Sequence, residues 1–153
     1  ATTLVGDFNS DGQLTVEDVD LLAAATRNPE LDSQYDLTND GQVNADDIFH
    51  WVDEIKNTWV GDANLDGQFD SADMVDVFGA GQYEDAILAN STWSTGDWNG
   101  DAEFDSSDLI FAFQHGGYEA GEKGVVAAVP EPSSSLLAVM AIFALSLFRF
   151  RQR

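Results

Sequence analysis

Four segments of the chain share one twelve-residue frame, and this repeat constrains the fold more than any other feature. The frames, numbered here as loops 1 to 4, run over residues 7–18, 36–47, 62–73 and 97–108. Side chains that carry oxygen stand at positions 1, 3 and 5 of every frame, and position 12 is always Asp. Alternate spacing in a tight loop points such side chains at a common centre, as in calcium-binding loops. The repeat therefore predicts four calcium-binding loops.

The predicted ligands occupy positions 1, 3, 5, 7, 9 and 12 of each loop. Position 7 is expected to offer its backbone carbonyl, and position 9 to act directly or through a water molecule. Flexible wrapping by about seven oxygens favours calcium over magnesium. An Asx-rich turn without metal is the alternative for a single loop, and four copies in one register argue against it. The predicted ligands are Asp7, Asn9, Asp11, Gln13, Thr15, Asp18, Asp36, Thr38, Asp40, Gln42, Asn44, Asp47, Asp62, Asn64, Asp66, Gln68, Asp70, Asp73, Asp97, Asn99, Asp101, Glu103, Asp105 and Asp108.

The four loops differ at two positions that matter for ion binding. Position 6, at the sharp turn, is Gly in loops 1 to 3 and Ala102 in loop 4. Positive φ at a residue with a Cβ costs on the order of 1 kcal/mol. Loop 2 has Thr38 at position 3, where a neutral hydroxyl is a weaker ligand than a carboxylate. We therefore predict that loops 1 and 3 are complete calcium sites and that loops 2 and 4 are weaker.

An apolar residue stands at position 8 of every loop, and an amphipathic stretch follows each loop. Apolar residues that recur every three or four positions predict helices over residues 18–27, 46–57, 73–78 and 108–114. A further short helix is expected over residues 83–90. The apolar position 8 suggests that loops pair back to back through a short β-bridge. The expected fold is mainly α, built from tandem EF-hand-like loop–helix repeats in two pairs.

The repeat resembles the type I dockerin repeat over roughly residues 5–116: an Asp-x-Asn-x-Asp-Gly loop is closed by Asp and followed by one helix. Dockerins hold two repeats about a pseudo-twofold axis, so the resemblance implies one pair over residues 1–57 and a second over residues 58–117. It also implies a cohesin-type partner, which dockerins recognise through a Ser/Thr pair at positions 10 and 11. Loop 4 alone carries that pair, as Ser106 and Ser107.

The resemblance leaves three roles open. A calcium-stabilised structural or surface-attachment module is the role that we favour, because three of the four loops lack the Ser/Thr pair. The alternatives are binding of a cohesin-like or other surface protein, and self-association into an extracellular matrix or filament.

The charge of the chain restricts its partners. The formal net charge is −22, from 28 acidic and 6 basic residues, and three of the basic residues stand at the C-terminal end. So negative a surface repels nucleic acid, and we expect no nucleic-acid partner. The absence of Cys excludes disulfides, thiolate metal sites and cysteine nucleophiles. With 44% hydrophobic residues, including 4 Trp and 10 Phe, the chain is expected to pack rather than to be disordered.

The C-terminal end departs from the repeat. The Gly/Ala/Glu-rich residues 118–129 are expected to form a flexible linker. Residues 130–153 combine Pro130-Glu131-Pro132, the apolar run 136–148 and a terminal Arg cluster, an order similar to the PEP-CTERM sorting signal of Gram-negative bacteria. That resemblance implies a transmembrane helix held transiently in the inner membrane, cleavage by an exosortase-type protease, and a final place at the cell surface or in the extracellular matrix. We expect an exported mature chain or the C-terminal piece of a longer precursor.

Nothing in the sequence predicts catalysis. The regularly spaced Asp residues are accounted for as ligands, and His50 and His115 have no recognisable partner pattern of Ser, Cys or metal ligands. The Trp residues are expected to pack in the core or in loops rather than to stack on sugar rings. A calmodulin-type sensor needs a Met-rich groove, and the chain has 2 Met. We therefore expect no enzymatic activity.

Overall fold

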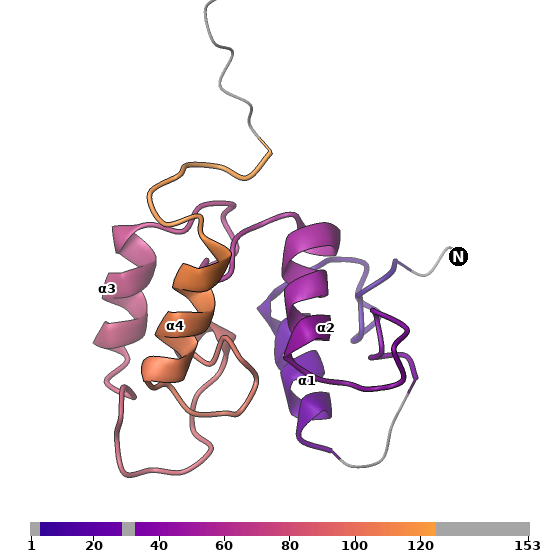
Figure 1. The fold of residues 1–153 in the computed structure, drawn as a ribbon, viewed down its shortest axis with the longest axis horizontal. Coiled ribbons are helices and arrows are strands. Elements are labelled where there is room, and N and C mark those ends of the chain that lie inside the picture. The colour runs from indigo at the N-terminus through magenta and orange to yellow at the C-terminus, as the bar shows by residue number, and fades with distance from the viewer. Residues whose placement is uncertain (1–3, 29–32, 125–153) are drawn as a thin grey trace, which may run out of the picture.

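The computed structural model describes residues 4–28 and 33–124, and this part of the chain is mainly α. Its elements are α1 (Val16–Thr26), α2 (Ala45–His50), the π-helix η1 (Trp51–Lys56), α3 (Ser71–Gly79), the 3-10 helix η2 (Trp93–Thr95) and α4 (Ser106–His115). The helices α1 and α2 contact each other in one half of the molecule, and α3 and α4 occupy the other half (Figure 1). Within the described ranges, none of the helices is both long and apolar enough to cross a membrane. The predicted sorting tail, residues 130–153, lies outside them.

The four α-helices begin slightly earlier than the sequence pattern predicts. Position 9 of each loop is the N-cap residue, and the Asp at position 12 is the third residue of the helix. The two residues form a capping box, in which each side chain accepts the backbone N–H of the other. The predicted starts at positions 11 and 12 therefore fall inside the first helical turn.

The helix that follows loop 2 packs against the start of the chain. It is α-helical as far as His50 and continues as the π-helix η1, which ends at Asn57 in the left-handed conformation (φ 58°). Trp51 Nε1 donates to the carbonyl of Gly6 at 2.8 Å, so the chain before loop 1 is fixed to the core. The backbone of Gly6 approaches the indole so closely that a Cβ would stand 2.7 Å from Trp51 Nε1.

Two aromatic clusters hold the second half together, and each contains rings from both repeats. The Phe at position 8 of each loop packs against the Phe and the Tyr that follow the loop of the other repeat, with ring centroids 5.1 to 5.6 Å apart. Offset and edge contacts of this kind stabilise beyond the area that they bury. The contacts are Phe69 with Phe113 and Tyr118, and Phe104 with Phe78 and Tyr83.

The prediction that loops pair back to back through a short β-bridge is wrong for loops 3 and 4. Phe69 forms its isolated parallel bridge with Tyr118, and Phe104 forms its bridge with Tyr83. The side chain of Trp98 lies between the two Phe rings, with centroids 5.7 and 6.0 Å away. Because a fully buried indole separates them, each Phe pairs with the segment that returns from the other helix.

Residues 83–90 are not helical, contrary to the prediction. The Asp85 carboxylate accepts the N–H of Ile87 at 2.8 Å and the side-chain amide of Asn90 at 2.9 Å. Ala89 is left-handed, with φ 55°. Such local side-chain hydrogen bonds give the backbone an alternative to the helix.

Residues 118–124, the start of the predicted linker, pack against the folded body. Lys123 pairs with Asp53, donates to the carbonyl of Thr58 at 2.9 Å and lies 5.1 Å from the ring centroid of Trp59. Trp59 in turn donates to the carbonyl of Gly121 at 2.8 Å. These contacts place the described part of the segment in the domain, because they fix it to the chain between the two halves.

Buried apolar side chains from both halves form one cluster, so the two predicted pairs of repeats share a core. The prediction that Trp residues pack inside is confirmed for Trp51, Trp93 and Trp98, which are at most 1% exposed. His115 is also packed, with its ring 4.1 Å from that of Phe49 in the other half. The largest members of the cluster are Val19, Leu22, Ile48, Trp51, Val52, Phe69, Val77, Trp93, Trp98 and Phe104.

Replacement of Gly96 by Ala should lower the free energy of unfolding by roughly 3 kcal/mol in urea titrations. Gly96 has φ +113°, and a Cβ would stand 2.4 Å from the Phe104 ring. The matched control is Gly81→Ala, where φ is +73° and nothing lies within 4 Å, so only the backbone cost of about 1 kcal/mol applies. Equal losses for the two variants would contradict the close packing at Phe104.

Candidate metal centre

The Asp at position 12 is the buried centre of every loop. Its side chain is at most 1% exposed in all four copies. In loop 1, Asp18 Oδ1 accepts the backbone N–H groups of Phe8 and Asn9 at 2.8 and 3.2 Å, and Oδ2 accepts that of Thr15 at 2.9 Å. One carboxylate thereby ties the start of the loop to the first turn of the helix. The same arrangement recurs at Asp47, Asp73 and Asp108.

The Asp at position 1 fixes the sharp turn. One of its oxygens accepts the N–H of position 6 at 2.8 to 3.0 Å in all four loops. Positions 4 and 6 are left-handed in every loop. Ala102 has φ 71°, which confirms the predicted strained turn in loop 4. The four loops therefore share one backbone shape, including the copy that lacks Gly at position 6.

The remaining predicted ligands also take equivalent places. The carboxylate at position 5 accepts the N–H of position 7 at 2.8 to 3.0 Å in each loop. The Asn at position 3 of loops 1, 3 and 4 accepts the N–H of position 5, while loop 2 has Thr38, which carries no amide carbonyl. Position 9 is engaged at the helix start in loops 2 to 4, where Asn44, Asp70 and Asp105 accept the N–H of position 11.

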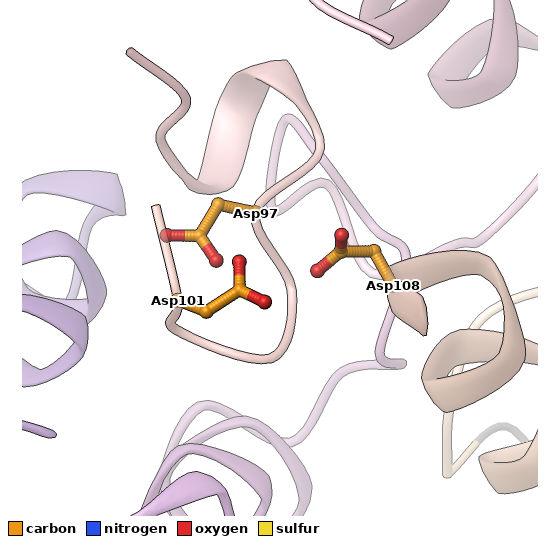
Figure 2. Close-up of side chains that lie close together, drawn as sticks. All are labelled: Asp97, Asp101 and Asp108. Atoms are coloured by element: carbon orange, nitrogen blue, oxygen red, sulfur yellow. The ribbon is translucent and has the colours of Figure 1, made fainter. Parts of the chain in front are cut away.

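Loop 4 brings three carboxylates together. One oxygen from each of Asp97, Asp101 and Asp108 lies within 4.8 Å of the other two. Figure 2 shows the side chains converging, two from the loop and Asp108 from the start of α4. Asp97 and Asp108 are 2% and 0% exposed, whereas Asp101 is exposed. Among the described residues, these three Asp residues form the one acidic group whose carboxylates lie close enough together to share a cation. Their all-oxygen ligands suit a hard divalent ion.

Burial makes the charged form of this group costly. Burial, together with the charge of Asp108, raises the pKa of Asp97 to about 7. Burial raises the pKa of Asp108 to about 6, although three backbone N–H groups act to lower it. In loop 3, burial also raises the pKa of Asp62 and of Asp73. A bound cation would balance these negative charges.

Basic residues at the loops were missed by the sequence analysis. Arg27, Lys56 and Lys123 are the three that precede the sorting tail, and isolated cations in a chain with 28 acidic residues are candidates for specific contacts. Each donates to a backbone carbonyl: Arg27 to Gly100 at 2.7 Å, Lys56 to Leu14 at 2.8 Å and Lys123 to Thr58 at 2.9 Å. Arg27 also lies 3.6 Å from the carboxylate of Asp97.

All twenty-four predicted ligands lie in the described part of the chain, on four loops of the same shape. Comparisons with protein-family models, with curated proteins and with solved structures find no match to this chain.

The metal-free protein should lose stability as the pH rises from about 4 to about 7. An unfolded Asp titrates near 3.8, whereas the folded pKa of Asp97 is about 7 and that of Asp108 about 6. Protonation therefore favours the folded state, its contribution is complete below the unfolded pKa, and it disappears as the pH passes the folded values. Urea unfolding in chelator should show a loss of a few kcal/mol across this range.

Asp97→Asn should flatten this pH dependence, because it removes one of the buried charges. Asp40→Asn, at an exposed position of loop 2, is the matched control and should leave the slope unchanged. A metal-free protein that becomes more stable between pH 4 and pH 7 would contradict the raised pKa values.

Proposed function

We propose that the chain is a calcium-binding module of an exported protein, in which bound calcium stabilises the fold, and that it has no enzymatic activity. The observation that carries the proposal is the group of Asp97, Asp101 and Asp108 in loop 4. Two of these carboxylates are buried beside each other, which is unfavourable unless a cation balances them. The exposed third carboxylate leaves an approach for the ion.

The donor set fits calcium. It contains carboxylate, amide and backbone oxygens and no sulfur, in loops that present oxygens at several positions around one centre. A flexible shell of this kind suits the larger calcium ion better than magnesium, which demands near-ideal octahedral geometry. Binding would add positive charge to a chain of formal net charge −22, so it should stabilise the compact state.

The proposal extends to loops 1 to 3, giving up to four calcium ions. Support comes from the shared hydrogen-bond frame: the carboxylates at positions 1, 5 and 12 make equivalent backbone contacts in every loop. The dockerin-like loop motif and the PEP-CTERM-like tail support a site of action outside the cytoplasm, at the cell surface. Calcium concentrations there are high enough to fill weak sites.

Calcium should raise the melting temperature of the full chain by roughly 10 °C or more relative to chelator, measured by circular dichroism. Asp→Asn at position 5 removes a ligand charge but keeps a side-chain oxygen that can accept the backbone N–H of position 7. Asp11, Asp40, Asp66 and Asp101 can therefore be tested one loop at a time. By calorimetric titration, we expect the Asp11 and Asp66 variants to lose the tighter binding events, because loops 1 and 3 are predicted to be complete. A melt that calcium leaves unchanged would refute the structural role.

A protein-partner role is the second candidate, and the exposed apolar side chains of α3 and α4 favour it. Val75 is 70% exposed and Ile110 is 55% exposed, at corresponding places in the two helices. Ser106 and Ser107, the pair that the dockerin family uses, lie exposed at the start of α4. These residues would give a cohesin-like or other surface protein a mixed apolar and hydroxyl surface.

Ile110→Asp should abolish calcium-dependent capture of a surface partner if α3 and α4 form the docking surface. Leu88→Asp is the matched control, because Leu88 is 86% exposed but lies outside both helices. Ser106→Ala with Ser107→Ala should weaken the capture if the dockerin mode applies. Capture that survives Ile110→Asp would exclude this surface, and calcium-dependent polymerisation without a partner would favour the matrix role.

A further inference from the structure

The end of α1 is fixed against loop 4, although the two are more than seventy residues apart in sequence. Thr26 Oγ1 and Arg27 Nη1 both donate to the carbonyl of Gly100, at 3.1 and 2.7 Å. Gly100 has φ +88°, and a Cβ there would stand 2.4 Å from the side chain of Ile48. The backbone of loop 4 therefore lies close against α1 and α2, and both the positive φ and the contact with Ile48 favour Gly at that position.

Arg27 places a positive charge beside the acidic group of loop 4. Its Nη1 lies 3.6 Å from Oδ2 of Asp97. The guanidinium is 38% exposed, so water screens it in part, whereas the Asp97 side chain is 2% exposed. In the described part of the chain, the other ion pair joins Lys123 to Asp53, which is not a predicted ligand. Arg27 is therefore the basic side chain paired with a predicted calcium ligand.

We propose that Arg27 is an internal counter-cation of loop 4, which stabilises the loop without metal and lowers its affinity for calcium. The inference rests on the proposed calcium function. A guanidinium beside Asp97 offsets the repulsion among the three carboxylates. A divalent ion that enters the same group is repelled by the same guanidinium. Since Arg27 favours the metal-free state over the loaded state, its removal shifts stability and affinity in opposite directions.

The counter-cation belongs to the first half of the molecule, and the ion-binding loop to the second. Calcium affinity at loop 4 therefore depends on the packing of α1 against this loop. Loop 4 was predicted from its sequence to be a weak site because of the strained backbone of Ala102. Arg27 is a second reason for weak calcium binding there.

The experiment compares the full-length wild type with Arg27→Gln. Selective 15N labelling of Ala reports on loop 4, because Ala102 occupies the turn position that is Gly in the other loops and donates its N–H to Asp97 at 2.9 Å. Arg27→Gln should bind calcium at loop 4 about three- to tenfold more tightly, in the range of a partly screened charge contact. In chelator, the same variant should be less stable to urea than the wild type.

Two variants separate charge from packing. Thr26→Val removes the other hydrogen bond to the Gly100 carbonyl without changing charge, so it should lower metal-free stability and should not tighten calcium binding. Lys56→Gln changes the net charge equally, but Lys56 contacts the backbone of loop 1, so loop 4 affinity should stay within about twofold of the wild type.

Loop 4 affinity that is unchanged or weaker in Arg27→Gln overturns the proposal, as does equal tightening by Thr26→Val. If Arg27→Gln is unfolded in chelator, Arg27→Lys decides instead: it keeps the charge, so tightening beyond about threefold would overturn the proposal and wild-type-like affinity supports it. A wild-type Ala102 resonance that does not respond to millimolar calcium would overturn the calcium function of loop 4 and this inference with it.

Discussion

The fold depends on four equivalent residues, the buried Asp at position 12 of each loop. Each copy accepts backbone N–H groups from the start of its loop and from the N-cap of the helix that follows. A charged acceptor satisfies several donors at once, which a neutral side chain does less well. The loop shape is thus set by hydrogen bonds within the chain, and a cation would contribute charge balance rather than shape.

The three basic residues before the tail link parts of the chain that are distant in sequence, and Arg27 links the two halves. Three cations precede the tail in a chain with 28 acidic residues, and each donates to a backbone carbonyl in another part of the chain. Carbonyl oxygens and a buried carboxylate attract them to the junctions between elements. The apolar cluster spans both halves and supplies most of the burial, and these basic residues add specific hydrogen bonds between elements.

Sequence reasoning predicted the parts of this structure that depend on local spacing. The loops, the helices after them and the positive φ of Ala102 all follow from residues close together in the chain. The carboxylate group of loop 4 followed too, since all its members lie in one frame. Contacts set by distant residues did not follow. Arg27 meets Asp97 only because α1 packs on loop 4, and no local pattern encodes that.

The contacts of Phe69 and Phe104 with aromatic rings of the other repeat were predictable only in part. Phe78 and Tyr83 have the same spacing as Phe113 and Tyr118, so the repeat extends beyond the twelve-residue frame. That extension was visible in the sequence. Which ring meets which loop was not, because the choice depends on Trp98 filling the space between Phe69 and Phe104.

The packing of residues 118–124 has a mechanical consequence. Lys123 holds the carbonyl of Thr58 and, through its own N–H, the carbonyl of Gly67. Tension applied to the chain after residue 124 would therefore reach loop 3 and the connection between the halves before it reached α4. If the module is tethered through its C-terminal side, loop 3 bears load, and an ion bound there would resist extension as well as unfolding.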